Sequence, residues 1–265
     1  MRADFEWKEK YGVQDLLKIM QRLRAPDGCP WDREQTHQSI KKNLIEETYE
    51  LVEAINRDSA PMMREELGDV LMQVVFHSCM AQESGRFTFD DVVDEVCRKL
   101  IVRHPHVFGS AEVSGTQDVL KNWEEIKRRT KGQKTSSQAM NSVPREFPAL
   151  MRAQKVQSRA AKSGFEFEDV FAAMEKLPEE YAEVQECLLS GDRQGAAEEL
   201  GDLLFSAVNV ARFLKADSEE LLTAATDKFI SRFQAAESMA QAEGRPLEER
   251  TPGELDELWD RVKKQ

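Results

Sequence analysis

The sequence predicts an all-α protein made of two tandem helical-bundle domains, and three observations support this prediction. Only 13 glycines and 9 prolines occur in 265 residues, which is about 8% where about 12% is usual. Charged residues make up 32% where about 25% is usual, and this balance favours amphipathic helices over turn-rich sheets. A series of motifs also occurs twice, in the same order in each half.

The first half is predicted to contain five helices, each bounded by residues that stop or cap helices. Pro26, Gly28 and Pro30 are predicted to end the first of them, and Gly85 ends the third. Asp90 and Thr116 are expected to cap the last two helices. The predicted helices cover residues 12–24, 36–57, 61–83, 90–103 and 116–131.

The second half repeats this plan after a polar stretch at 132–147, which is predicted to be a linker. It separates an N-terminal domain at 1–131 from a C-terminal domain at 148–265. Gly191 and Asp192 make a short turn, so the helices on either side are expected to be antiparallel neighbours. The predicted helices cover residues 148–164, 169–189, 194–214, 218–241 and 252 onwards.

The repeated motifs are rich in carboxylates. Residues 46–50 read EETYE and residues 179–183 read EEYAE, while EELGD occurs at both 65–69 and 198–202. Residues three or four apart share one face of a helix, so each half is expected to hold four acids facing each other across a helix pair. These are Glu180, Glu183, Glu199 and Asp202 in the second half, and Glu47, Glu50, Glu66 and Asp69 in the first.

Four such acids are expected to need a cation, protonation or good hydration. Two charges ~6 Å apart repel by roughly 3 kcal/mol at an effective dielectric constant of about 20, so four could cost on the order of 15 kcal/mol, as much as the stability of a whole domain. Oxygen ligands at this density suit Mg²⁺, or Mn²⁺ as an alternative. A single E-E-x-x-E is more often a solvated helix face, but the repeated pairing with E-x-x-D favours a metal site.

Basic and aromatic residues follow the acids in both halves. Lys228 and Arg232 match Lys99 and Arg103 in spacing, and one turn of helix separates the members of each pair. Opposite a metal-loaded cluster they are expected to hold phosphate oxygens. Trp259 can stack on a base or fill the core.

Charge and hydropathy limit the partners. The net charge of −12 argues against a nucleic-acid-binding surface. No G-x-x-x-x-G-K-[ST] motif occurs, so a P-loop protein is not expected. The first ten residues hold no apolar core and no stretch is long enough to span a bilayer, so a cytoplasmic protein without membrane contact is expected.

The motif series resembles the MazG family of nucleoside triphosphate pyrophosphohydrolases, in its long form with two copies of the domain. Supporting stretches are MQRLRAPDGCPWDREQT at 20–36, RHPHVFG at 103–109 and PALMRAQKVQSRAAKSGFEF at 148–167. The resemblance implies an all-α homodimer that uses Mg²⁺ to cleave NTPs and dNTPs to the monophosphate and pyrophosphate. A housecleaning or stress-related role in nucleotide pools is also implied.

The resemblance assigns roles to individual residues of the C-terminal copy, which it favours as the catalytic one. Glu180, Glu183, Glu199 and Asp202 match the metal ligands, and catalysis is assigned to Glu179, Glu180 and Glu183. Pro178 departs from a regular helix interior, so the helix is expected to restart there. Substrate contacts are assigned to Lys176, Glu179, Glu198, Lys228, Arg232 and Trp259.

Two other functions stay open at this point. One is a pyrimidine-specific enzyme of the dUTPase or dCTPase type. The other is a helical dimerisation or adaptor protein whose acids serve only as solubilising charge.

Overall fold

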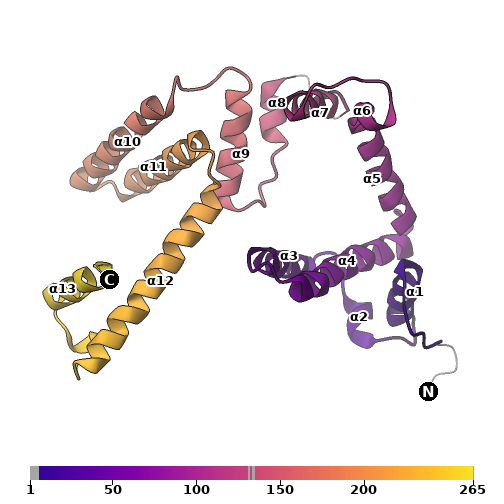
Figure 1. The fold of residues 1–265 in the computed structure, drawn as a ribbon, viewed down its shortest axis with the longest axis horizontal. Helices are drawn as coiled ribbons and strands as arrows, with labels where there is room; N and C mark the ends of the chain where they lie inside the picture. The colour runs from indigo at the N-terminus through magenta and orange to yellow at the C-terminus, as the bar shows by residue number, and fades with distance from the viewer. Residues whose placement is uncertain (1–5, 131, 133–134, 265) are drawn as a thin grey trace. The chain divides into compact units, whose positions relative to one another are not determined.

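The computed structural model describes residues 6–130, 132 and 135–264, and these residues form helices with no strand. The all-α prediction is therefore confirmed. The chain divides into two compact units, Met1–Ile126 and Lys127–Gln265 (Figure 1). Residues 131 and 265, where the predicted domains end, lie outside the described residues.

Unit 1 contains the five predicted helices and two short ones that the sequence analysis missed. The start of α3 lies about five residues later than predicted, because Thr36 and Ser39 bond to each other's backbone amides at 3.1 and 2.9 Å and form a turn. Pro30 begins a helix as its first residue and is not a breaker. The elements are α1 (Val13–Arg24), α2 (Pro30–Glu34), α3 (Lys41–Asn56), α4 (Ala60–Glu83), α5 (Phe89–Arg103), α6 (Pro105–Phe108) and α7 (Thr116–Thr130).

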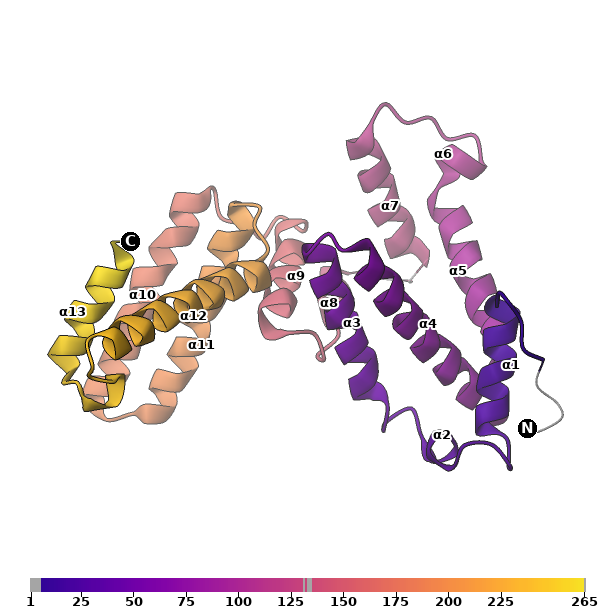
Figure 2. The same ribbon diagram turned by 60° about the horizontal axis from the view of Figure 1, so that its bottom comes forward.

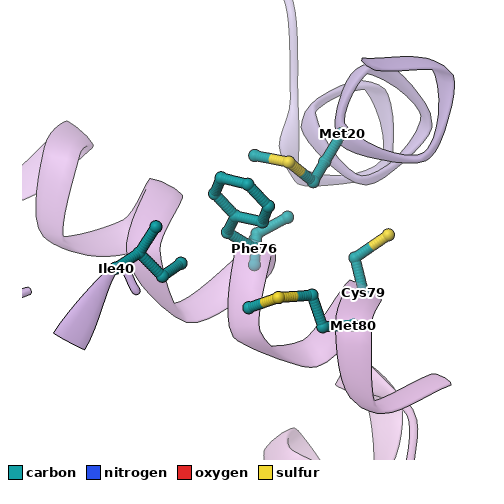
Figure 3. Packing of buried hydrophobic residues seen from close by; sticks show 6 residues of the cluster. Met20, Ile40, Phe76, Cys79 and Met80 are labelled. Carbon is teal, nitrogen blue, oxygen red and sulfur yellow. The ribbon is translucent and has the colours of Figure 1, made fainter. Parts of the chain in front are cut away.

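The core of unit 1 lies where α1 packs on α4, beside the α3–α4 hairpin. Met20 of α1 and Phe76 of α4 are 3% and 4% exposed, and Figure 3 shows their side chains next to each other. Arg24 ties the end of α1 to Glu83 of α4 through two hydrogen bonds of 2.7 Å. The α1–α4 contact is thus fixed by apolar packing and by a bidentate ion pair.

Unit 2 begins at Lys127, near the end of α7 and before the stretch at 132–147 that is predicted to be a linker. Within 132–147 the structure shows helix α8, which begins with a capping box at Thr135. The Arg159 side chain donates hydrogen bonds to the Ala139 carbonyl and to Ser142, so α8 packs on α9. The remaining elements are α8 (Ser136–Asn141), α9 (Ala149–Ala161), α10 (Val170–Ser190), α11 (Arg193–Phe213), α12 (Ser218–Ala242), the 3₁₀ turn η1 (Leu247–Glu249) and α13 (Pro252–Lys263).

Helices α10 and α11 form the predicted antiparallel hairpin (Figure 2). Gly191 ends α10 at φ +81°, a left-handed conformation that suits glycine. Asp192 caps α11 by accepting a 2.9 Å hydrogen bond from the Gly195 amide. Gln154 of α9 holds the start of α12 by accepting hydrogen bonds from the Ser218 amide and hydroxyl. Among the described residues, every helix is too short or too polar to cross a membrane.

Thr251→Ala is expected to lower the free energy of unfolding of α13 by about 1 kcal/mol, since Thr251 forms a capping box with Glu254. Hydrogen bonds from Thr251 and Arg245 lower the pKa of Glu254 to about 2. The stabilisation by the carboxylate is therefore complete above its ordinary pKa near 4.5 and is lost as the pH falls towards 2.

Urea titrations followed by tryptophan fluorescence measure this effect. The difference between the wild-type protein and Thr251→Ala should shrink between pH 6 and about pH 2. Thr223→Ala, in the exposed middle of α12, is the control. Equal unfolding curves for the wild-type protein and Thr251→Ala at pH 6 would contradict the importance of the cap.

Candidate functional site

Three of the predicted acids in unit 2 come together at the α10–α11 hairpin. Glu180, Glu199 and Asp202 each offer a carboxylate oxygen, and these oxygens lie within 4.8 Å of one another. Glu180 is buried, with 7% of its surface exposed, while Asp202 is open to solvent. Because the helices are antiparallel and each pair of acids follows helical spacing, α10 and α11 present the acids to one point.

The fourth acid, Glu183, lies outside this group of three but touches it. Contact between the carboxyl groups of Glu183 and Glu199 raises the pKa of Glu199. Burial and the charges of Asp202 and Glu180 raise it further. The cluster is therefore short of positive charge, which a cation would supply.

Lys176 lies one turn before these acids on α10. Its ammonium group contacts Glu179 at 2.7 Å and Glu180 at 3.2 Å, so it reaches the cluster through Glu180. The expectation that the helix restarts at Pro178 is wrong, because α10 is continuous through this residue. The carbonyl that loses its amide partner belongs to Met174, which is exposed, so water can satisfy it.

Unit 1 contains a matching group. Glu47, Glu66 and Asp69 bring carboxylate oxygens within 4.8 Å of one another, and Glu50, like Glu183, is not part of the group. Burial raises the pKa values of Glu47 and Glu66, and neighbouring acids raise them further. In both copies the group of three therefore consists of the first acid of E-x-x-E and both acids of E-x-x-D.

The predicted phosphate-binding residues lie on a different helix from the acids. Figure 1 shows α12, which carries Lys228 and Arg232, leading away from the α10–α11 hairpin towards α13. No ion pair of the described residues joins either of these side chains to the four acids.

Two further predicted substrate contacts have partners outside the acid group. The Trp259 ring packs 5.3 Å from the Phe229 ring, centre to centre, and against the small core between α12 and α13. Glu198 is exposed and accepts a 3.3 Å hydrogen bond from Gln194. Glu198 lies on α11 directly before Glu199, whereas Trp259 lies on α13.

A cavity of about 620 Å³ adjoins the acid group, and the sequence analysis missed it. Glu180 and Asp202 line it together with Lys176, Gln157 and Asn209. The signal was available in the repeat, since Gln157 and Asn209 are polar where the first copy has apolar residues.

Comparison with known proteins identifies this arrangement. The model of the MazG nucleotide pyrophosphohydrolase domain matches residues 35–108 and again residues 172–235. The chain belongs to the MazG family. Each matched MazG segment includes one complete set of four acids and the basic pair that follows it.

Several relatives match the MazG chain over most of its length. A protein of Thermotoga maritima named nucleoside triphosphate pyrophosphohydrolase/pyrophosphatase MazG is 46% identical over 94% of this chain and 95% of its own. A nucleoside triphosphate pyrophosphohydrolase of Escherichia coli K12 is 43% identical over 96% and 97%. YabN of Bacillus subtilis, described as uncharacterized, is 46% identical over 92% of this chain and 50% of its own.

Proposed function

We propose that this MazG chain hydrolyses nucleoside triphosphates, both NTPs and dNTPs, to the monophosphate and pyrophosphate, and that Mg²⁺ or Mn²⁺ is required. The observation that carries the proposal is the group of Glu180, Glu199 and Asp202 at the edge of a cavity of about 620 Å³. The names of the relatives from Thermotoga maritima and Escherichia coli support the reaction. A role in cleansing nucleotide pools follows from it.

The donor atoms fit a hard divalent ion. Three carboxylates provide only oxygen ligands, and Mg²⁺ is commonly held by one or two carboxylates together with substrate phosphates. The raised pKa of Glu199 shows that the group is crowded with negative charge. When bound, the ion would neutralise the triphosphate and lower the pKa of a nearby water.

Residues of the chain are proposed to bind the ion, to accept a proton and to contact the substrate. Glu180, Glu183, Glu199 and Asp202 are proposed to hold the ion. Glu183 stands outside the group of three, so it is the acid of the four least committed to the ion, and we assign proton acceptance to it. Lys176 pairs with Glu179, so it can orient that carboxylate towards substrate or water. The further substrate contacts that we propose are Glu198, Lys228, Arg232 and Trp259.

We propose that two copies of the chain form a homodimer and that its two units are tandem domains. Leu222 and Phe229 of α12 are 57% and 56% exposed, and Leu204 of α11 is 56% exposed. Such apolar helix faces are typical of surfaces that bind another protein. Burial of the α12 face by a second copy would bring Lys228 and Arg232, which flank it, into a closed site.

A substrate panel with and without EDTA tests the reaction. Pyrophosphate release is expected from ATP, GTP, CTP, UTP and their deoxy forms, with at least about a 100-fold loss when EDTA removes the metal. Turnover of dUTP and dCTP alone would instead show a pyrimidine-specific enzyme. Pyrophosphate release from no nucleotide at any Mg²⁺ concentration would favour an adaptor protein and reject the proposal.

A further inference from the structure

The cavity beside the acid group contains a buried acceptor without a partner. Gln157 of α9 is 6% exposed, and its amide nitrogen donates a 2.7 Å hydrogen bond to the carbonyl of Phe205 in α11. This bond fixes the amide orientation and leaves Oε1 with no hydrogen-bond partner in the described structure. An unpaired buried oxygen costs about 1–3 kcal/mol, so this atom is poised to accept a hydrogen bond from a ligand.

A donor faces the same cavity from α11. Asn209 Oδ1 accepts hydrogen bonds from Arg212 at 2.8 and 3.0 Å, and Arg212 is itself paired with Glu166 at 2.5 Å. The Asn209 amide nitrogen is thereby left as the outward group. Gln157, Asn209, Arg212 and Glu166 all line the cavity, whose apolar wall includes Phe165 and Phe205.

In the N-terminal copy, the positions that correspond to Gln157, Asn209 and Arg212 hold core residues. Phe76 and Cys79 lie 133 residues before Asn209 and Arg212, at the same distance from the E-x-x-D acids. Met20 takes the place of Gln157, since Lys-Ile-Met-Gln-Arg at 18–22 matches Lys-Val-Gln-Ser-Arg at 155–159. Met20, Phe76 and Cys79 pack together as core (Figure 3). The acids are thus kept in both copies, while at these three positions the second copy has polar side chains where the first has apolar ones.

We propose that this cavity binds the nucleobase of the triphosphate, and that Gln157 and Asn209 are its specificity-determining residues; the proposal rests on the function proposed above. Every nucleobase presents an N–H donor beside a carbonyl or ring-nitrogen acceptor, which matches one acceptor and one donor. Phe165 and Phe205 provide apolar surface for the ring. Glu180 and Asp202 at the cavity wall place the triphosphate on the acid group.

The competing location for the base is Trp259. Its ring is half-buried against Phe229 and the α12–α13 core. Stacking on a base would require the ring to exchange these contacts for the ligand. The cavity needs no such exchange, because the Gln157 oxygen that it offers has no hydrogen-bond partner in the described structure.

Kinetics of Gln157→Leu and Asn209→Leu test the proposal in the full chain. Each variant is expected to lower kcat/KM by about 10- to 50-fold, to different extents for ATP, GTP, CTP and UTP, because each removes one hydrogen bond to the base. Competitive inhibition by inorganic tripolyphosphate, which has no base, should be unchanged within about twofold. Trp259→Leu is measured in parallel.

The double variant Gln157→Met/Asn209→Phe guards against simple misfolding. It installs the residues that the N-terminal copy already packs, so the melting temperature should hold or rise while NTP turnover falls by about 50-fold or more. Unchanged kcat/KM for all four nucleotides in both leucine variants, or base-dependent changes confined to Trp259→Leu, would overturn the proposal. A wild-type chain that hydrolyses no nucleotide would reject the proposed function instead.

Discussion

Glu180→Gln is expected to lower the rate of pyrophosphate release by at least about 10³-fold, whereas Glu47→Gln should leave it within about twofold. Glu180 is the buried member of the C-terminal acid group and also lines the cavity. Glutamine keeps its size but removes the charge that holds the ion. A 10³-fold loss corresponds to about 4 kcal/mol of lost transition-state stabilisation.

Glu47 is the matched control because it occupies the same position in the N-terminal group. Pyrophosphate release and Mn²⁺ binding are measured for both variants, with melting temperatures in the absence of metal. Neither variant should melt below the wild-type protein, since each removes like-charge repulsion within its group. Near-normal turnover by Glu180→Gln would contradict the site, and equal losses in both variants would contradict a preference for the C-terminal copy.

The acid group could be predicted from the sequence because each step depends on local rules. Spacing of three residues places Glu199 and Asp202 on one face of a helix. Gly191 then ends α10 in a left-handed conformation and forces the antiparallel turn that brings Glu180 opposite them. Glu183, the fourth predicted acid, lies beside Glu199 and outside the group of three.

The remaining site residues depend on how helices pack, which local spacing does not encode. Lys228 and Arg232 lie on the predicted helix, but the direction of α12 is set by Gln154, which binds the Ser218 amide and hydroxyl at the start of that helix. The cavity was missed for a similar reason. The role of Gln157 depends on the packing of α9 on α11, because this packing pairs its amide nitrogen with Phe205 and leaves its amide oxygen without a partner.

The errors in the predicted starts of two helices had a different cause. Near these starts, side chains form hydrogen bonds with backbone amides and so set the first residue of the helix. Thr36 and Ser39 bond each other's amides and delay the start of α3. Thr88, not Asp90, caps α5 by accepting a hydrogen bond from the Asp91 amide. In both places the apolar periodicity predicted the helix correctly, and the hydrogen bonds near its first turn set the residue at which it begins.

Leu222→Glu is expected to convert a homodimer into monomers and to lower pyrophosphate release by at least about 10³-fold. Leu222 and Phe229 on this face of α12 are more than half exposed in the described chain, and a buried glutamate without a partner would oppose the pairing of two such faces. Lys228 and Arg232 would then stay in water, away from the pyrophosphate group whose charge they are proposed to stabilise. Loss of one such contact costs about 10²- to 10³-fold, and here both are lost together.

The control for this variant is Ser231→Glu, which adds the same charge nine residues further along α12, on the opposite face of the helix from Leu222. Sedimentation equilibrium gives the oligomeric state, and pyrophosphate release is measured on the same samples. Ser231→Glu should remain dimeric and active, since it leaves the apolar face of α12 intact. A wild-type chain that is active as a monomer would reject the homodimer. A Leu222→Glu variant that is monomeric yet fully active would show that each chain completes its own site, with Lys228 and Arg232 reaching the acids by a movement of α12 alone.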